Sequence, residues 1–440
     1  MRSFRPVQFA MVACLATAAP LHAQSLIELY DAARASDATY QSARAQYDAN
    51  LARSDQAKAA ILPAANLTVG VNRNLFDNSN PEYQRAYTSQ SATVAASQPL
   101  YRPGNWASYE QGKRLVDLAE AQLLAAEQDL VLRVSQAYFD VLAASDSLTF
   151  VRAQKSAVAE QLASAKRNFE VGTSTVTDSR EAQARYDLVI AQEIASENDL
   201  RVKKLLLDQL VSRVATEPRP VLAPIALPVL QPQDLGSWVT MAETSHPAVL
   251  QAQTALDVAR LEITKAKADA KPTVDLTAGY NVSRNPNGTA SSTLNSHNHS
   301  TSVGVQLTLP LFAGFAIQNR IRETLSLEDK AQADLEATRR AVTQATRTAF
   351  FGVLSGLGQI KALEAAEASS QSALEANQLG YRVGVRINID VLNAQSQLYQ
   401  TKRDLARARY DVLVGSLRLR QANGSLKPQD LQSVNALLAP

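Results

Sequence analysis

Cysteine is nearly absent from this chain of 440 residues, and long apolar runs are absent beyond its first residues. The one cysteine is Cys14, so the rest of the chain can form no disulfide and offers no thiolate for metal binding or nucleophilic chemistry. After residue 23, no stretch reaches the roughly 18 to 20 consecutive apolar residues of a membrane-spanning helix. If the chain crosses a bilayer, it must do so with strands.

The N-terminus has the features of an export signal. Two arginines precede and flank the start of an apolar stretch from Val7 to Ala19, and Leu21-His22-Ala23 fits a signal-peptidase site. We therefore expect cleavage near Ala23. Lipoprotein processing at Cys14 is the weaker alternative, because the apolar run before it is short and continues beyond it.

Charge and motifs exclude several classes of function. Removal of residues 1–23 leaves 42 basic residues against 42 acidic ones, without the basic stripe that binding of nucleic acid requires. No Ser–His–Asp arrangement, glycine-rich phosphate loop or pair of catalytic acids stands out. We expect His297-Asn298-His299 in an exposed polar loop rather than in a metal site, since no acid or cysteine is near. The sequence thus predicts neither an enzyme nor a cofactor.

The chain contains an internal repeat. Residues 63–70 (PAANLTVG) are mirrored by residues 272–279 (PTVDLTAG), and further matches follow at nearly the same offset. A proline-rich segment separates the halves and predicts an extended linker. The predicted organisation is a signal peptide at 1–23, a first repeat at 24–217, a linker at 218–233, a second repeat at 234–427 and a tail at 428–440.

Each repeat contains one long tract that predicts helix. Proline is absent from Gly104 to Glu217 and from Leu311 to Lys427, where Ala, Leu, Gln, Glu and Arg abound. In the first tract apolar residues recur in steps of four and three, which is typical of a coiled-coil seam interrupted only at Lys155. The seam comprises Leu130, Val134, Ala137, Val141, Ala144, Leu148, Val151, Val158, Leu162, Ala165 and Phe169, and a looser one comprises Val342, Thr346, Ala349, Val353, Gly356, Ile360 and Leu363.

Both tracts are interrupted once. Turns are predicted at 172–177 and 384–389, where Gly172 and Gly384 suit the left-handed end of a helix. Thr175 or Thr177 in the first turn, and Asn388 in the second, can cap the returning helix. The sequence therefore predicts two antiparallel hairpins, at about 103–215 and 313–423. An outgoing arm from 103 to 171 would be about 100 Å long.

Short strands are predicted before each hairpin. Apolar and polar residues alternate, as in Val274, Leu276 and Ala278 against Thr273, Asp275 and Thr277. Each run has about the length of a membrane-barrel strand. A polar loop containing Pro81 joins the first pair, and a polar loop from 285 to 300 joins the second. The predicted strands cover about 64–75, 88–101, 273–284 and 300–312.

Four strands cannot close a barrel, and an open sheet edge is not tolerated in lipid. Subunits must therefore share one barrel, and these constraints leave two, three or four copies open. The expected fold is mainly α with a small β part, and the product is a tube with a water-filled lumen. The alternative is a periplasmic adaptor or scaffold that uses its coiled-coil hairpins to grip partners, but such a protein would lack paired membrane strands.

Over essentially the whole exported chain, the sequence resembles the TolC family of outer-membrane efflux and type I secretion channels. The similarity is carried by the repeat order, by residues 169–178 and 380–392, and by Ala394-Gln395 and 406–410. The resemblance implies a homotrimer with a twelve-stranded outer-membrane barrel and an α-helical periplasmic tunnel. It also implies a tip that is closed at rest and opened by an inner-membrane transporter and a periplasmic adaptor.

The resemblance further implies a set of gate residues. Tyr381 and Arg386 match residues that restrain the closed tip, with partners at Thr177, Asp178 and Gln161, while Gln378 stands where an acid can occur. Asp390 matches a pore-constricting aspartate whose three copies would attract cations. Asn393 replaces a second aspartate of some members, which predicts a weaker cation-selective field.

Simpler roles remain open for the same residues. Asp178 and Asp390 suit the first turn of any helix because of the helix dipole. Tyr381 and Arg386 could be solvated tip residues, and Asn393 could be a polar coiled-coil position that specifies register.

Overall fold

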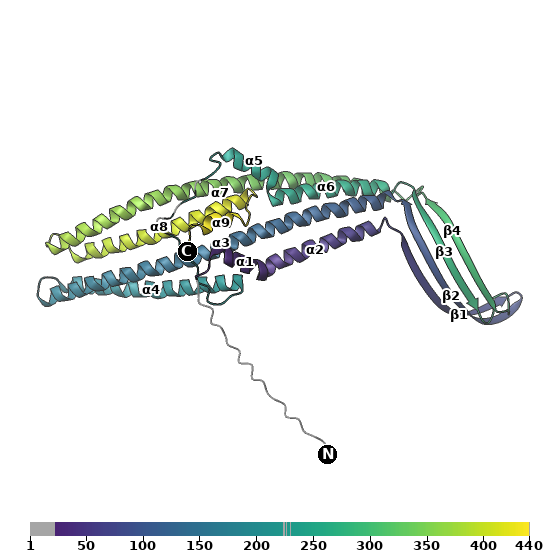
Figure 1. Cartoon of the computed structure of the whole chain (residues 1–440), viewed down its shortest axis with the longest axis horizontal. Helices are drawn as coiled ribbons and strands as arrows, with labels where there is room; N and C mark the ends of the chain where they lie inside the picture. The colour runs from purple at the N-terminus through teal and green to yellow at the C-terminus, as the bar shows by residue number, and fades with distance from the viewer. Residues whose placement is uncertain (1–22, 223–224, 226, 229, 440) are drawn as a thin grey trace, which may run out of the picture.

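The computed structural model describes residues 23–439 except 223–224, 226 and 229. The predicted signal sequence up to residue 22, with Cys14 inside it, lies outside the described residues. The fold is mainly helical with one small sheet, as the sequence predicts. Figure 1 shows long helices lying side by side and the sheet projecting from one end of them.

The elements follow one order twice, as a pair of helices, a pair of strands and a long hairpin. The first series is α1 (Leu26–Ser36), α2 (Ala38–Ala59), β1 (Ala64–Ser79), β2 (Glu82–Tyr101), α3 (Pro103–Glu170) and α4 (Val176–Val211). The second series is α5 (Leu235–Ser245), α6 (Pro247–Ala268), β3 (Thr273–Asn285), β4 (Ser296–Thr308), α7 (Ala316–Arg382) and α8 (Asn388–Ala422), followed by a short α9 (Asp430–Asn435).

The hairpins α3–α4 and α7–α8 pack through the apolar positions that the heptad pattern marks. Leu130, Val134 and Val158 are fully buried in α3, and Ile360 is fully buried in α7. The polar exception in the first seam, Lys155, donates a hydrogen bond to Glu193 of α4. That bond lowers the pKa of the Glu193 carboxyl. The two hairpins contact each other mainly through α3 and α8.

Both ends of the described chain contact the linker, beside the middle of α3. Gln24 forms a bridge with Pro218, and Val221 forms one with Leu438. The hydroxyl of the buried Tyr138 in α3 donates to the carbonyl of Arg219 at 2.9 Å. Around this point the largest apolar cluster joins α1, α3, α8 and the tail with α9. The linker is thus held by both termini and by α3.

The four strands form one antiparallel sheet in the order β1–β2–β3–β4, so β1 and β4 are its edges. Pro81 lies in the connection between the first two strands, as predicted, but the predicted length is wrong: β1 and β2 stay paired as far as Ser79 and Glu82, which leaves a two-residue turn. The alternation of apolar residues ends before the strands do, because their outer parts are polar on both faces. Polar pairs such as Asn74 with Ser89 accompany the ladder there.

The second strand pair also differs from the prediction. Strand β4 begins at Ser296 and ends at Thr308, so it lies four residues earlier than expected. His297 and His299 therefore belong to a strand and not to a loop. Pro310 lacks a donor for the ladder, and Gly314 and Phe315 take positive φ values of 57° and 63° before α7 begins.

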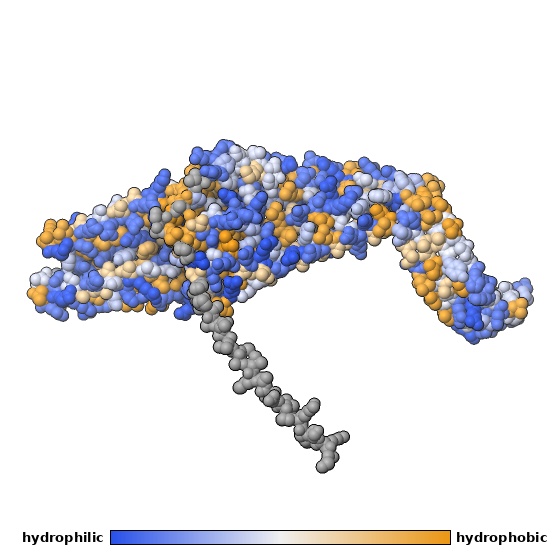
Figure 2. Space-filling view, in the orientation of Figure 1, coloured by the Kyte–Doolittle hydropathy of each residue, from blue (hydrophilic) through white to orange (hydrophobic). Residues whose placement is uncertain are grey.

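Alternate strand residues on one face of the sheet are apolar and exposed. Val69 is 68% exposed and Val303 is 74% exposed. A contiguous apolar surface across four strands is not typical of a sheet that faces water. Figure 2 shows hydrophobic colour on the part of the sheet nearest the helices and hydrophilic colour at its far end. Exposed Trp106, Phe312 and Phe315 lie where helices and sheet meet. Within the described residues, no helix is long and apolar enough to cross a membrane.

Candidate functional site at the hairpin tips

The first turn is closed by its own residues. Gly172 takes a φ of +79°, a conformation that favours glycine. Thr175 is the N-cap of α4, and its hydroxyl accepts from the Asp178 backbone N–H at 3.2 Å. The Asp178 carboxylate in turn accepts from the Thr175 backbone N–H at 3.0 Å, which completes a capping box. The carboxylate of Asp178 thus stabilises its own helix.

The second turn lacks such a cap. Gly384 takes a φ of +78°, but Ile387 occupies the N-cap of α8 and makes no side-chain bond. The prediction that Asn388 caps this helix is wrong. Asn388 is the first residue of α8, is fully buried, and directs its side chain to the other hairpin. The two turns therefore differ at the position where a helix usually receives a cap.

Asn388 joins the two hairpins through both atoms of its amide. Its Oδ1 accepts from Nε2 of Gln161 on α3, and its Nδ2 donates to the Asp178 carbonyl at 3.2 Å. Leu392, one turn further along α8, is fully buried among apolar residues of α3 and α4. A buried polar side chain with both partners satisfied contributes stability and fixes one arrangement.

Two further polar contacts cross between the hairpins. The Tyr381 hydroxyl accepts from Nδ2 of Asn168 at 3.1 Å, and Oδ1 of Asn393 accepts from the Arg185 guanidinium at 2.8 Å. Asn393 thus holds a cation of α4 rather than standing free at the tip. Asn168 and Arg185 were missed by the sequence analysis, because the pattern of neither helix shows which residue of the other hairpin it meets.

Asp390 and Arg386 lie together on the second hairpin. The Arg386 guanidinium is 3.6 Å from an Asp390 carboxylate oxygen, with the arginine 60% exposed and the aspartate 33% exposed. The aliphatic part of Arg386 lies across Gly380, where an added Cβ would come within 2.7 Å of the arginine Cγ. Gly380 therefore leaves room for the arginine at the turn, a requirement that the sequence pattern did not reveal.

Among the described residues of one chain, neither Tyr381 nor Arg386 bonds to the partners that the resemblance implies, Thr177, Asp178 and Gln161. Thr177 and Gln378 are exposed on α4 and α7. Tyr381 reaches Asn168, Gln161 reaches Asn388, and Arg386 reaches Asp390. The described residues contain no group of three or more His, Cys, Asp or Glu side chains that could hold a metal ion.

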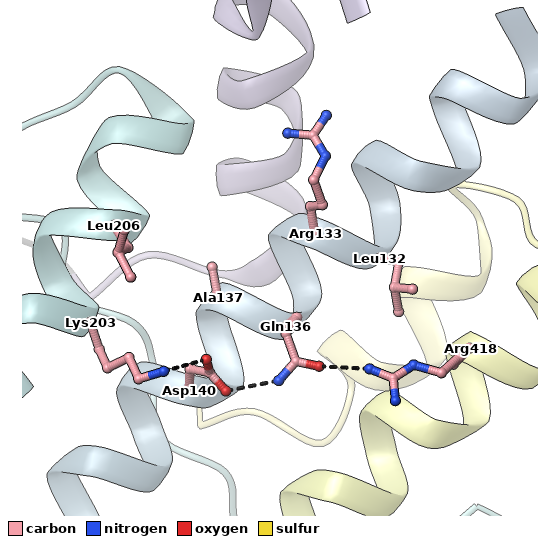
Figure 3. A pocket seen from close by; sticks show the side chains of 8 residues that line it. All are labelled: Leu132, Arg133, Gln136, Ala137, Asp140, Lys203, Leu206 and Arg418. Carbon is pink, nitrogen blue, oxygen red and sulfur yellow. Dashed lines mark hydrogen bonds and ion pairs between the residues drawn. The ribbon is translucent and has the colours of Figure 1, made fainter. Parts of the chain in front are cut away.

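Far from the tips the same helices are joined by further polar contacts. Figure 3 shows a polar chain across a surface pocket: Lys203 of α4 donates to Asp140 of α3 at 2.9 Å, and Arg418 of α8 donates to Gln136 of α3 at 3.3 Å. Nearby, the Tyr410 hydroxyl donates to Asp146 at 2.7 Å, and burial raises the pKa of the Asp146 carboxyl.

The fold and the tips together define a class of protein. A sheet with an exposed apolar face, continued on one side by long hairpins that meet at polar tips, describes one subunit of an outer-membrane channel. The family model described as outer membrane efflux protein matches residues 29–212 and 238–425. The chain belongs to this family, whose members are outer-membrane channels and not enzymes.

Individual relatives agree with this assignment. The chain is 34% identical to the outer membrane protein TolC of Vibrio cholerae over 94% of both chains. It is 30% identical to the alkaline protease secretion protein AprF of Pseudomonas aeruginosa, over 94% of this chain and 87% of AprF. The solved outer membrane protein VceC of Vibrio cholerae superposes with a TM-score of 0.79 at 18% identity, over 91% of this chain and 96% of VceC. That last likeness concerns the fold.

Proposed function

We propose that three copies of this chain share one twelve-stranded barrel and one helical tunnel, and form the exit duct of a tripartite efflux pump or type I secretion system. The observation that carries the proposal is the four-stranded sheet with two open edges, β1 and β4, and an exposed apolar face. In lipid, the backbone N–H and C=O groups of an edge strand have no water to bond, so each edge must pair with another strand. Pairing of β1 with β4 of the next copy removes every edge at once.

The periplasmic end of this duct is the hairpin tips, which lie at the opposite end of the molecule from the sheet (Figure 1). We propose that the tip arrangement described above is the closed state, and that a periplasmic adaptor and an inner-membrane transporter open it. The names of the relatives support both uses of such a duct, since AprF is a protease secretion protein and the family is one of efflux proteins.

The proposed gate has two parts. Asp390 lines the pore constriction together with Asn393, and three copies would bring three carboxylates together and attract cations. The closed state is restrained by polar contacts, which bias a two-state hairpin without carrying the stability of the fold. The restraining residues are Gln161, Thr177, Asp178, Gln378, Tyr381 and Arg386, to which the geometry adds Asn168, Arg185 and Asn388.

Conductance in planar bilayers tests the proposal. The purified protein should insert and form ion-conducting pores of one unit size, and cross-linking should capture three subunits per pore. A periplasmic scaffold would bind adaptor hairpins without conducting. Repeated failure of a folded, oligomeric preparation to conduct would therefore favour the scaffold and overturn the duct.

A further inference from the structure

The outward face of the sheet carries basic residues at its end far from the helices. Strand residues of like parity share a face. Arg73 therefore lies on the face of the exposed Val69 and Val71, and His297 and His299 lie on the face of Val303. Arg284 of β3 is the direct cross-strand partner of His297.

Three of these basic residues, Arg284, His297 and His299, form a compact cluster with Tyr280 on β3 and β4, which we call the rim cluster. The two histidine rings have their centroids 4.6 Å apart, and the Tyr280 hydroxyl is 3.1 Å from Nδ1 of His299. Arg73 lies at about the same level on β1, where its guanidinium donates to the Thr88 hydroxyl at 3.2 Å. All four side chains of the rim cluster are exposed.

Strand length separates the rim cluster from the helix end of the sheet by about the height of one apolar band. From Leu309, at the helix end of the sheet, to His299 the chain advances ten residues, or about 33 Å along an extended strand. A strand tilt of about 35–45° reduces this to roughly 25 Å, the usual height of the apolar band of a membrane barrel. If the exposed Leu309 and Phe312 mark the periplasmic boundary of the lipid, His299 marks the outer one.

The charge on this face is of one sign at this level. The acids of the outward face, Asp77 and Glu82, lie beyond it, at the turn between β1 and β2. On the opposite face, the residues at the level of the rim cluster are neutral, as with Ser283 and Asn298. Positive charge is therefore directed at the surrounding membrane and not at the lumen.

We propose that the rim cluster binds phosphate groups of anionic lipid in the outer leaflet of the membrane. Guanidinium groups bind phosphate through paired, charge-assisted hydrogen bonds, and ring N–H groups of histidine add donors. A metal ion fits less well, because Arg284 beside the histidines repels a cation and offers no lone pair. Two histidines also fall short of the three or four protein ligands of common metal sites. The inference rests on the outer-membrane location of the sheet and goes beyond the role as a duct.

Lipid titration of the full-length protein in detergent tests this inference. The probes are bisphosphorylated lipid A, the same lipid without phosphates, and inorganic phosphate, with bound lipid counted by native mass spectrometry. The variants are Arg284→Gln with His297→Gln, and Arg73→Gln alone in case the double variant does not fold. The matched control is Arg85→Gln, which removes an arginine of β2 that lies on the opposite face.

The expected result is a loss of affinity for the phosphorylated lipid by about tenfold or more in the double variant, by a smaller factor in Arg73→Gln, and by none in Arg85→Gln. Equal affinity of the unchanged protein for both lipids would overturn the inference. Displacement of the lipid by inorganic phosphate at the same concentration would instead indicate a site for the free anion.

Two further readouts separate the alternatives. Tight binding of Zn²⁺ alone that requires both histidines, with lipid affinity independent of Arg284, would replace the lipid site by a metal site. Conductance in planar bilayers should be the same for the unchanged protein, for Arg73→Gln and for the double variant, whose altered residues lie on the membrane-facing side. Absence of pores in the unchanged protein would contradict the proposed duct, whereas normal pores with unselective lipid binding would contradict only the lipid site.

Discussion

The side-chain amide of Gln161 donates to Oδ1 of Asn388, a residue 227 positions further along the chain and fully buried at the start of α8. The same asparagine donates to the Asp178 carbonyl of the first turn. One side chain thus bonds to both arms of the first hairpin, and the helix it begins has no side-chain cap. This contact makes Asn388 the strongest candidate for a residue that holds the tips together.

Replacement Asn388→Ala should therefore loosen the closed tip. It removes two hydrogen bonds between the hairpins, each contributing roughly 0.5–1.5 kcal/mol, so the open fraction should rise about tenfold. Single-channel recording in planar bilayers measures this as higher conductance or longer openings. The control is Arg382→Ala, which removes an exposed cation near the same turn. If both variants conduct alike, Asn388 is not part of the gate.

The contact between Tyr381 and Asn168 makes a second, smaller prediction. Tyr381→Phe removes the hydroxyl that accepts from the asparagine, and Asn168→Ala removes the donor. Either change should increase the open fraction by about two- to tenfold. Because both delete one bond, the double variant should behave like either single variant. Additive effects in this cycle would show that the two residues act separately.

Asp390 should set the preference of the pore for cations. Asp390→Asn removes a carboxylate from each subunit, so the reversal potential in a KCl gradient should move toward zero. Arg386→Ala should act in the opposite direction, because it removes the guanidinium 3.6 Å from that carboxylate, and it should also raise conductance by loosening the tip. Asp187→Asn, an exposed acid on α4, is the control. An unchanged reversal potential in Asp390→Asn would exclude the carboxylate ring.

The joint between α1 and α2 should make stability depend on pH. Asp37 accepts two hydrogen bonds from the Arg133 guanidinium, at 3.0 and 3.1 Å, and caps α2 at Tyr40. The hydrogen bonds from Arg133 hold the pKa of the Asp37 carboxyl below its ordinary value. The stabilisation is therefore present above the ordinary pKa of the unfolded carboxyl and is lost as pH falls through the lower pKa of the folded state.

Asp37→Asn keeps a capping side chain and removes the charge. At neutral pH it should lower the free energy of unfolding by roughly 1 kcal/mol, and the difference from the unchanged protein should vanish in acid. Thermal unfolding followed by circular dichroism between pH 3 and 7 measures this. Asp129→Asn is the control. Asp129 also pairs with Arg133, but it is half exposed and lies on α3 with that arginine, so it does not connect two helices. A difference that persists in acid would mean that the charge is not its source.

The sequence predicts the helical part of the fold far better than the contacts of the tips. Both hairpins are located by the absence of proline, the heptad spacing and the glycines at 172 and 384. These signals suffice because the formation and the end of a helix depend on residues close in the sequence. The ends of the strands are predicted less well. Strand β2 begins six residues before the predicted residue 88, because its first residues are polar on both faces and show no alternation of apolar and polar side chains. Asn388 shows the limit most clearly. Its local position predicts a cap, and only the packing of α8 against α3 turns its side chain to Gln161.

The duplicated order of elements has a consequence for symmetry. Three copies of a chain built from two similar halves present six similar units around one axis, so the tube approaches six-fold symmetry wherever the halves agree. The halves differ at the turns. Thr175 caps its own helix, whereas the side chain of Asn388 bonds to the other hairpin. Alternate units around the entrance are therefore unequal, with one set self-contained and the other set dependent on its neighbours. The proposed opening therefore requires the movement of only three of the six units.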